Sequence, residues 1–172
     1  MGSTGKKREK VVENGQTPAS TDPPLGMYAV KPDSAGRMKL PADFLEYFAA
    51  LGHTKFFVTS LDRSLGTIYP LSLWRATEKF LENDQQDPEL SQAAAFNAAD
   101  LGGKAELDGN GRLLLPAELR KELGLENGPV RLKAAGECVD IFSEATYEAL
   151  RERGKTVGPA GMAKLRQLGI PK

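Results

Sequence analysis

The same short pattern occurs twice in the chain, and each copy has an aspartate four residues before an arginine. Residues 33–41 read DSAGRMKLP, and residues 108–116 read DGNGRLLLP. An arginine held beside a turn presents a planar guanidinium, which can contact phosphates or bond to a guanine edge through two hydrogen bonds. Alternatively, the aspartate and the arginine form a salt bridge that only braces the turn. The residues alone leave both roles open for Arg37 and Arg112.

The turn is encoded by Asp33 and Gly36 in the first copy and by Asp108 and Gly111 in the second. An aspartate carboxylate accepts hydrogen bonds from backbone amides one or two residues further on. A glycine adopts the positive φ that a tight turn between strands requires. Because a carboxylate repels a phosphate, we expect both aspartates to shape the turn rather than to contact a polyanion.

Further basic residues in the first half of the chain could add phosphate contacts. For any one of them taken alone, a solvated surface charge is the favoured interpretation. These candidates are Lys31, Lys39, Lys55, Arg63 and Arg75, and the stretch KKREK near the N-terminus is another.

The net charge is zero, so bulk charge indicates neither nucleic acid nor a membrane surface. Its distribution is uneven. Residues 26–75 carry six basic and four acidic side chains, residues 76–99 one and five, and residues 100–154 eight and eleven. Residues 155–172 carry four basic side chains and no acidic one. Positive charge therefore gathers in the first half and at the C-terminus.

Several function classes lack the residues that they need. DGNG resembles the start of an EF-hand, but Arg112 and Leu119 occupy the fifth and twelfth loop positions, where oxygen ligands are required. One histidine, His53, and one cysteine, Cys138, cannot assemble a zinc site or an internal disulfide. Phosphate-binding, nucleophile-elbow and dinucleotide motifs are absent. No apolar run approaches the roughly 20 residues of a membrane span. We therefore predict a protein without cofactor or metal that is not an enzyme.

The turns are positioned by an element order that occurs twice: strand, turn, strand, helix, strand, turn, strand, helix. Pro41 and Pro116 end a strand and begin a helix, since proline lacks a ladder donor but suits a first helical turn. The predicted helices span residues 41–52, 71–83, 88–102, 116–124 and 143–153. Nine aromatic side chains are expected in the core rather than in base stacking: Tyr28, Phe44, Phe48, Phe56, Phe57, Tyr69, Trp74, Phe80 and Phe142.

Composition and repetition divide the chain into five segments. They are a disordered arm (1–25), a first unit (26–83), a helical bridge (84–103), a second unit (104–153) and a C-terminal tail (154–172). The tail could form a short amphipathic helix with Met162, Leu165 and Leu168 on one side.

An Asp-x-x-Gly-Arg turn followed by an apolar strand, a proline and an amphipathic helix resembles the AbrB/SpoVT swapped-hairpin family. Two copies in one chain, joined by a helical bridge, resemble the MraZ family over about residues 26–152. The resemblance implies an α+β fold of two AbrB/SpoVT-like swapped-hairpin β-barrel units with flanking helices. It also implies that Asp33, Arg37, Asp108 and Arg112 form the DNA-binding signature of the family.

Proteins of that family are cytoplasmic, nucleoid-associated transcriptional regulators that assemble into homo-oligomeric rings. They bind repeated boxes in double-stranded DNA upstream of division and cell-wall genes. The resemblance therefore implies a sequence-specific DNA-binding regulator that does not bind membranes, with Arg37, Arg112, Lys39 and Lys31 as its contacts.

One departure supports a different function. The family carries several basic residues in the bridge and at the start of the second unit, whereas the stretch AAAFNAADLGGKAELD here has only Lys104. An oligomeric protein-interaction or scaffold module that has lost DNA binding is therefore the alternative.

Overall fold

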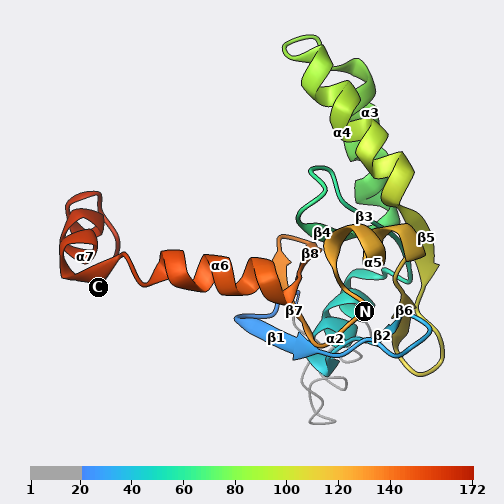
Figure 1. Ribbon diagram of the computed structural model, residues 1–172, viewed down its shortest axis with the longest axis horizontal. Helices are drawn as coiled ribbons and strands as arrows, with labels where there is room; N and C mark the ends of the chain where they lie inside the picture. Colours follow the sequence, from blue (N-terminus) through green and yellow to red (C-terminus); the bar gives the residue numbers. More distant parts are fainter. Residues whose placement is uncertain (1–20) are drawn as a thin grey trace, which may run out of the picture.

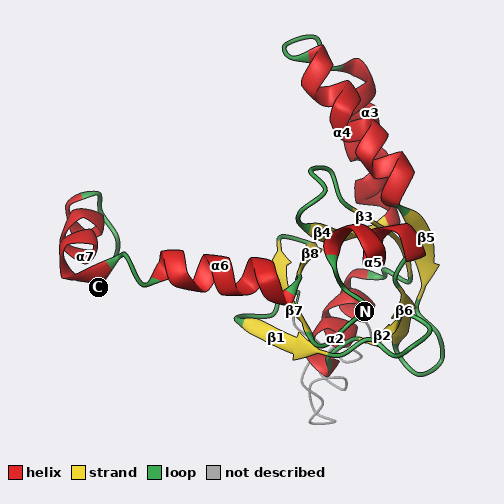
Figure 2. Cartoon of the chain, viewed as in Figure 1, coloured by secondary structure: helices red, strands yellow, loops and turns green. Residues whose placement is uncertain are grey.

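The computed structural model describes residues 21–172, and within them the chain forms a mixed α+β fold with antiparallel sheets (Figures 1 and 2). The strands are β1 (Met27–Val30), β2 (Arg37–Lys39), β3 (Lys55–Thr59), β4 (Gly66–Pro70), β5 (Gly103–Glu106), β6 (Arg112–Leu114), β7 (Val130–Ala135) and β8 (Cys138–Phe142). The helices are α2 (Ala42–Leu51), α3 (Leu71–Asn83), α4 (Pro88–Leu101), α5 (Ala117–Leu123), α6 (Glu144–Gly154) and α7 (Gly158–Gln167). The α+β class predicted from sequence is confirmed. Most of the predicted arm, residues 1–20, lies outside the described residues.

Strands from both units alternate in one six-stranded sheet, in the order β1-β7-β8-β4-β3-β5. The opening strand β1 pairs with β7 of the second unit, and β5 pairs with β3 of the first. The strands on either side of each Asp–Arg turn therefore do not pair with one another. The tight turn predicted between two strands thus does not join a local hairpin, because each opening strand extends the sheet of the other unit.

A second, two-stranded sheet joins the two copies of the repeated pattern directly. Strands β2 and β6 run antiparallel, with Met38 opposite Leu113, and both side chains are fully buried. The pairing extends past the strands, because the Leu40 amide donates to the Gly111 carbonyl and the Leu115 amide donates to the Gly36 carbonyl, at 3.0 and 2.9 Å. We call this sheet, together with its two flanking turns, the ribbon.

One hydrophobic core contains side chains from both units. Helix α2 buries Phe44 and Phe48, and helix α5 buries Leu119 and Leu123 at the same four-residue spacing. These side chains belong to one buried cluster with Met38, Val58, Ile68, Leu113, Leu132 and Ile141. Because both repeats contribute to this cluster, loss of a core contact in one unit should destabilise the other.

Helices α3 and α4 form a hairpin that stands away from the sheets (Figure 1). Trp74 anchors its base by stacking on Phe57, with ring centroids 4.7 Å apart. Helix α4 begins at Pro88 as predicted, and the Asp87 carboxylate caps it by accepting a hydrogen bond from the Leu90 amide. The prediction that Phe80 is a core residue is wrong, because 65% of its side chain is exposed on this hairpin.

Helices α6 and α7 extend from the body of the molecule in a different direction from the α3–α4 hairpin (Figure 1). Ser143 caps α6 by accepting a hydrogen bond from the Thr146 amide, and the helix then leaves the sheet as a rod. Helix α7 lies at the far end of this rod and buries none of its residues. Within residues 21–172, no helix is both long and apolar enough to cross a membrane.

Candidate nucleic-acid interface

The first turn is closed by the Asp33 carboxylate. Its Oδ1 accepts hydrogen bonds from the amides of Ala35 and Arg37, both at 2.9 Å. Gly36 adopts a φ of 88°, which an L side chain rarely tolerates. The hydrogen bond from the Arg37 amide is the main cause that lowers the pKa of Asp33. The carboxylate is therefore ionised at neutral pH, and it accepts hydrogen bonds from the backbone of its own turn.

The second turn repeats this geometry. Asp108 Oδ1 accepts from the amides of Asn110 and Arg112 at 2.8 and 2.9 Å, and Gly111 has a φ of 73°. The Arg112 amide is likewise the main cause that lowers the pKa of Asp108. In addition, Arg112 Nε donates to Asp108 Oδ2 at 2.9 Å, whereas within residues 21–172 the side chains of Arg37 and Asp33 form no such bond.

Strand register brings the two arginines onto one surface. Arg37 lies opposite Leu114, and Lys39 lies opposite Arg112, while the buried pair between them points to the core. Side chains alternate along a strand, so the two outward pairs share a face, with Arg37 and Lys39 about 7 Å apart along the strand. We call Arg37, Lys39, Arg112 and Leu114 the ribbon face. It carries three cations around one leucine that is 51% exposed.

The cations of the ribbon face are held to different degrees. The Arg37 side chain is exposed and has no hydrogen bond or ion pair with any other residue in 21–172. The Arg112 side chain is 37% exposed. It uses its Nε to bind Asp108, so its two terminal amino groups can still donate to a ligand. Lys39 Nζ donates to the Asn110 carbonyl, which ties it to the second turn. Arg37 is therefore the cation with the most donors available to a ligand.

A fourth cation, the guanidinium of Arg120, lies at the first turn, and it was not predicted from the sequence. A Cβ atom added to Gly36 would lie 2.5 Å from the guanidinium carbon of Arg120 in α5. The equivalent place at the second turn is taken by Leu45, 2.7 Å from a Cβ built on Gly111. Leu45 and Arg120 are separated by 75 residues, as Asp33 and Asp108 are. The 75-residue repeat, which matches Arg120 with Leu45, is therefore the sequence feature that could have identified Arg120 as a residue at the first turn.

The remaining basic candidates do not join the ribbon face. Lys31 is exposed between β1 and the first turn, outside the paired strands. Lys55 lies on β3 opposite Glu106, and Arg75 on α3 forms an exposed ion pair with Glu78 at 3.2 Å. Of the candidates Arg37, Arg112, Lys39 and Lys31, the structure thus brings the first three together.

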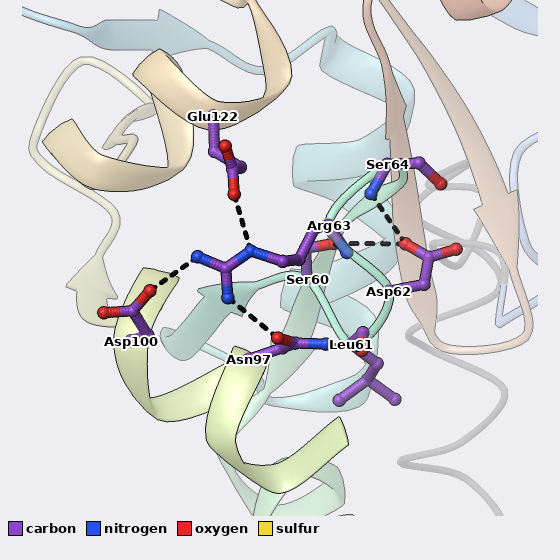
Figure 3. Close-up of polar contacts among 8 residues, drawn as sticks. All are labelled: Ser60, Leu61, Asp62, Arg63, Ser64, Asn97, Asp100 and Glu122. Carbon is purple, nitrogen blue, oxygen red and sulfur yellow. Dashed lines mark hydrogen bonds and ion pairs between the residues drawn. The ribbon is translucent and has the colours of Figure 1, made fainter. Parts of the chain in front are cut away.

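Arg63, one of the candidate phosphate contacts, is neither free for a phosphate nor a solvated charge, because its guanidinium is engaged by three side chains (Figure 3). Its Nε donates to Glu122 at 2.5 Å, and its two terminal amino groups donate to Asn97 and Asp100 at 2.7 and 2.6 Å. Its backbone has a φ of 63°, and its amide donates to Ser60 Oγ. Arg63 thus connects the β3–β4 loop to α4 and to α5 of the second unit.

We expect Arg63→Ala to lower the free energy of unfolding by about 1–3 kcal/mol, since it removes three charge-assisted or polar hydrogen bonds at a side chain that is one third exposed. Arg75→Ala is the matched control, because its exposed pair with Glu78 should contribute less than about 1 kcal/mol. Urea unfolding followed by Trp74 fluorescence measures both. Equal midpoints for the two variants would contradict the bracing role of Arg63.

The other chemically distinctive residues are engaged in packing or pairing. Burial raises the pKa of the Cys138 thiol to about 11, so it is protonated at neutral pH. His53 Nε2 lies 2.8 Å from Glu137 Oε1. The part of the chain that the structure describes contains no cluster of three or more histidine, cysteine or acidic side chains arranged to hold a metal ion. The ribbon face is therefore the best-defined candidate site.

Comparisons with known proteins agree on one family. Residues 103–157 match the family model described as "MraZ protein, putative antitoxin-like". A protein named transcriptional regulator MraZ from Thermomicrobium roseum is 32% identical over 84% of this chain and 98% of its own length. A second, from Desulfitobacterium hafniense, is 33% identical over 85% of this chain and 99% of its own length. A third, from Acidobacterium capsulatum, is 33% identical over 56% of this chain and 66% of its own length. Because the first two of these relatives are 32% and 33% identical to the chain over almost their whole length, the chain belongs to the MraZ family.

Proposed function

We propose that this protein is a sequence-specific DNA-binding transcriptional regulator and that the ribbon face is its DNA contact. The observation that carries this proposal is the register of β2 and β6, in which Arg37, Lys39 and Arg112 share one exposed face. The names of the relatives, which are transcriptional regulators, support the same function.

A two-stranded ribbon has the dimensions to enter the major groove of B-form DNA. With its free donors, Arg37 would bond to the O6 and N7 atoms of a guanine. Leu114, exposed between the cations, would contact a thymine methyl group. Arg112 and Lys39, each already held by the second turn, would bind phosphates and fix the position of the ribbon. Asp33 and Asp108 would keep the turns rigid.

The wider assignment follows from the family and from the repeat. We propose two interlocked swapped-hairpin units, residues 26–83 and 104–153, joined by the bridge 84–103 and followed by the tail 154–172. Several such subunits in a homo-oligomeric ring would bind repeated DNA boxes upstream of division and cell-wall genes, in the nucleoid of the cytoplasm. Linked weak sites gain avidity from the high effective concentration of the neighbouring boxes.

Selection of bound fragments from fragmented genomic DNA, followed by fluorescence anisotropy on one selected box, tests the proposal. A shared sequence among the selected fragments, bound more tightly than a scrambled duplex, is the expected result. Equal affinity for the selected and scrambled duplexes would contradict sequence-specific binding.

Salt dependence tests the phosphate contacts individually. The logarithm of the binding constant should fall by about 0.9 per phosphate contact for each tenfold rise in salt. Lys39→Ala should therefore reduce that slope by about 1. Lys55→Ala is the control and should leave the slope unchanged, because Lys55 lies in the main sheet opposite Glu106. If both variants reduced the slope equally, the effect of Lys39 would come from general surface charge and not from a specific phosphate contact.

A scaffold or protein-interaction module remains the second candidate, and the acidic α3–α4 hairpin favours it. Residues 76–99 carry five acidic side chains and one basic one, a charge that repels DNA. In this case the oligomer would form normally, and anisotropy would detect no salt-sensitive binding to any genomic fragment.

A further inference from the structure

The α3–α4 hairpin contains a groove that the DNA-binding proposal does not use. Its volume is about 330 Å³, and its apolar surface comes from Trp74, Leu81, Ala95 and Ala99. Glu78 and Glu82, one helical turn apart, line the side formed by α3. The groove thus combines an apolar floor with two carboxylates.

The charge of the groove is uneven along its length. The basic residues that line it, Arg75 and Lys104, belong to the start of α3 and to β5, where the hairpin joins the sheets. Arg75 already pairs with Glu78. Toward the tip the hairpin is acidic, and it exposes Phe80, Leu90 and Phe96 to about two thirds. Its ligand should therefore be a basic segment with one apolar side.

The C-terminal tail of the same sequence has this chemistry. Met162, Leu165 and Leu168 follow one another at three-residue intervals, and all three are exposed. Lys164 and Arg166 flank Leu165 on either side, about 100° away around the helix. Residues 155–172 contain four basic side chains and no acidic one. Helix α7 is thus a cationic amphipathic helix whose apolar side is left exposed by the other residues that the structure describes.

The tail does not reach the groove of its own chain. The rod of α6 holds α7 on one side of the molecule, while the α3–α4 hairpin extends from another (Figure 1). Helix α6 is fixed at its base by the Ser143 cap and by contacts with β7 and β8. A tail helix bound in this groove would therefore come from a second copy of the chain.

We propose that α7 of one subunit binds in the groove between α3 and α4 of the next. The apolar side of α7 would cover Trp74 and Leu81, and one of its two flanking cations, Lys164 or Arg166, would approach Glu78 and Glu82 on the α3 side. Each subunit would donate one tail and accept one, which is a head-to-tail contact that builds a ring or an open chain. The proposal specifies the interface of the subunit association included in the proposed function, and it does not depend on DNA binding.

Charge reversal tests this interface in the full-length chain without DNA. The tail variant carries Lys164→Glu with Arg166→Glu, and the groove variant carries Glu78→Lys with Glu82→Lys. Each should raise the concentration at which the oligomer is half dissociated by at least about tenfold, because like charges then face each other. The measurement is molar mass by light scattering over a dilution series, with circular dichroism to verify that each variant is folded.

Rescue makes the test specific. The chain with all four substitutions, and an equimolar mixture of the two variants, should both recover the wild-type mass, since each restores opposite charges at the interface. Arg151→Glu with Arg153→Glu on α6 is the matched control and should leave the mass unchanged. A wild-type chain that is monomeric, or variants that keep the wild-type mass, would overturn the proposal.

Separate DNA measurements distinguish this proposal from the DNA-binding one. Anisotropy on a single selected box reports the ribbon face, and light scattering without DNA reports the tail contact. If the tail variant loses affinity for the single box at unchanged mass, α7 is a DNA contact and the subunit interface is refuted. If the tail variant loses mass and keeps its affinity for the single box, the interface is supported.

Discussion

Replacement of Arg37 and Arg112 together by alanine is expected to abolish specific DNA binding while the protein stays folded. A well-placed contact between arginine and guanine or phosphate contributes about 1–3 kcal/mol to discrimination or affinity. The loss of both should therefore weaken binding to the selected box by at least about 30-fold. Neither guanidinium lies in the core, so the melting temperature should change little.

The two single variants should differ. Arg37→Ala removes the guanidinium that has no hydrogen bond or ion pair within residues 21–172, and it should relax the sequence preference most. Arg112→Ala removes a side chain already paired with Asp108, and it should weaken all duplexes more evenly. The control is Arg75→Ala with Arg151→Ala, which removes the same charge from two exposed helices. Equal losses for this control and for the ribbon variant would contradict a specific site.

The second large effect concerns stability. Leu113→Ala should lower the free energy of unfolding by about 2–5 kcal/mol, because it leaves a cavity opposite Met38 in the shared core. That is a large fraction of the 5–15 kcal/mol typical of a folded domain. Since both units contribute to one core, the transition seen by Trp74 in the first unit should shift together with the loss of helical circular dichroism.

Leu114→Ala is the control for this prediction. It changes the neighbouring residue of the same strand, but that side chain is 51% exposed on the ribbon face, so the cost should be below about 1 kcal/mol. If Leu113→Ala left the Trp74 transition at its wild-type midpoint, the two units would unfold independently. The shared core would then not couple the stability of one unit to that of the other.

Local features of the fold could be predicted from sequence, because residues within a few positions of one another determine them. Asp33 and Gly36 determine the first turn through bonds to the backbone within four residues. Proline starts and glycine ends gave the limits of α2 and α5 almost to the residue. The composition of residues 76–99 likewise indicated an acidic helical segment.

Pairing between distant strands could not be predicted in this way. Strand β1 could have paired with its neighbour in sequence, but it pairs with β7, about 100 residues later. The period-two pattern of a strand identifies its buried face and not its partner. For the same reason, neither the placement of Arg120 at Gly36 nor the clamp around Arg63 was predicted.

The central claim is that the ribbon face contacts DNA, and site-directed photocrosslinking tests it most directly. With Cys138→Ser as background, a photocrosslinker on Leu114→Cys probes the ribbon face, and one on Lys133→Cys probes the exposed side of β7. The account predicts that the selected box crosslinks at position 114 and not at position 133. Crosslinking at 133 alone, or at neither position in a complex that still forms, would contradict it.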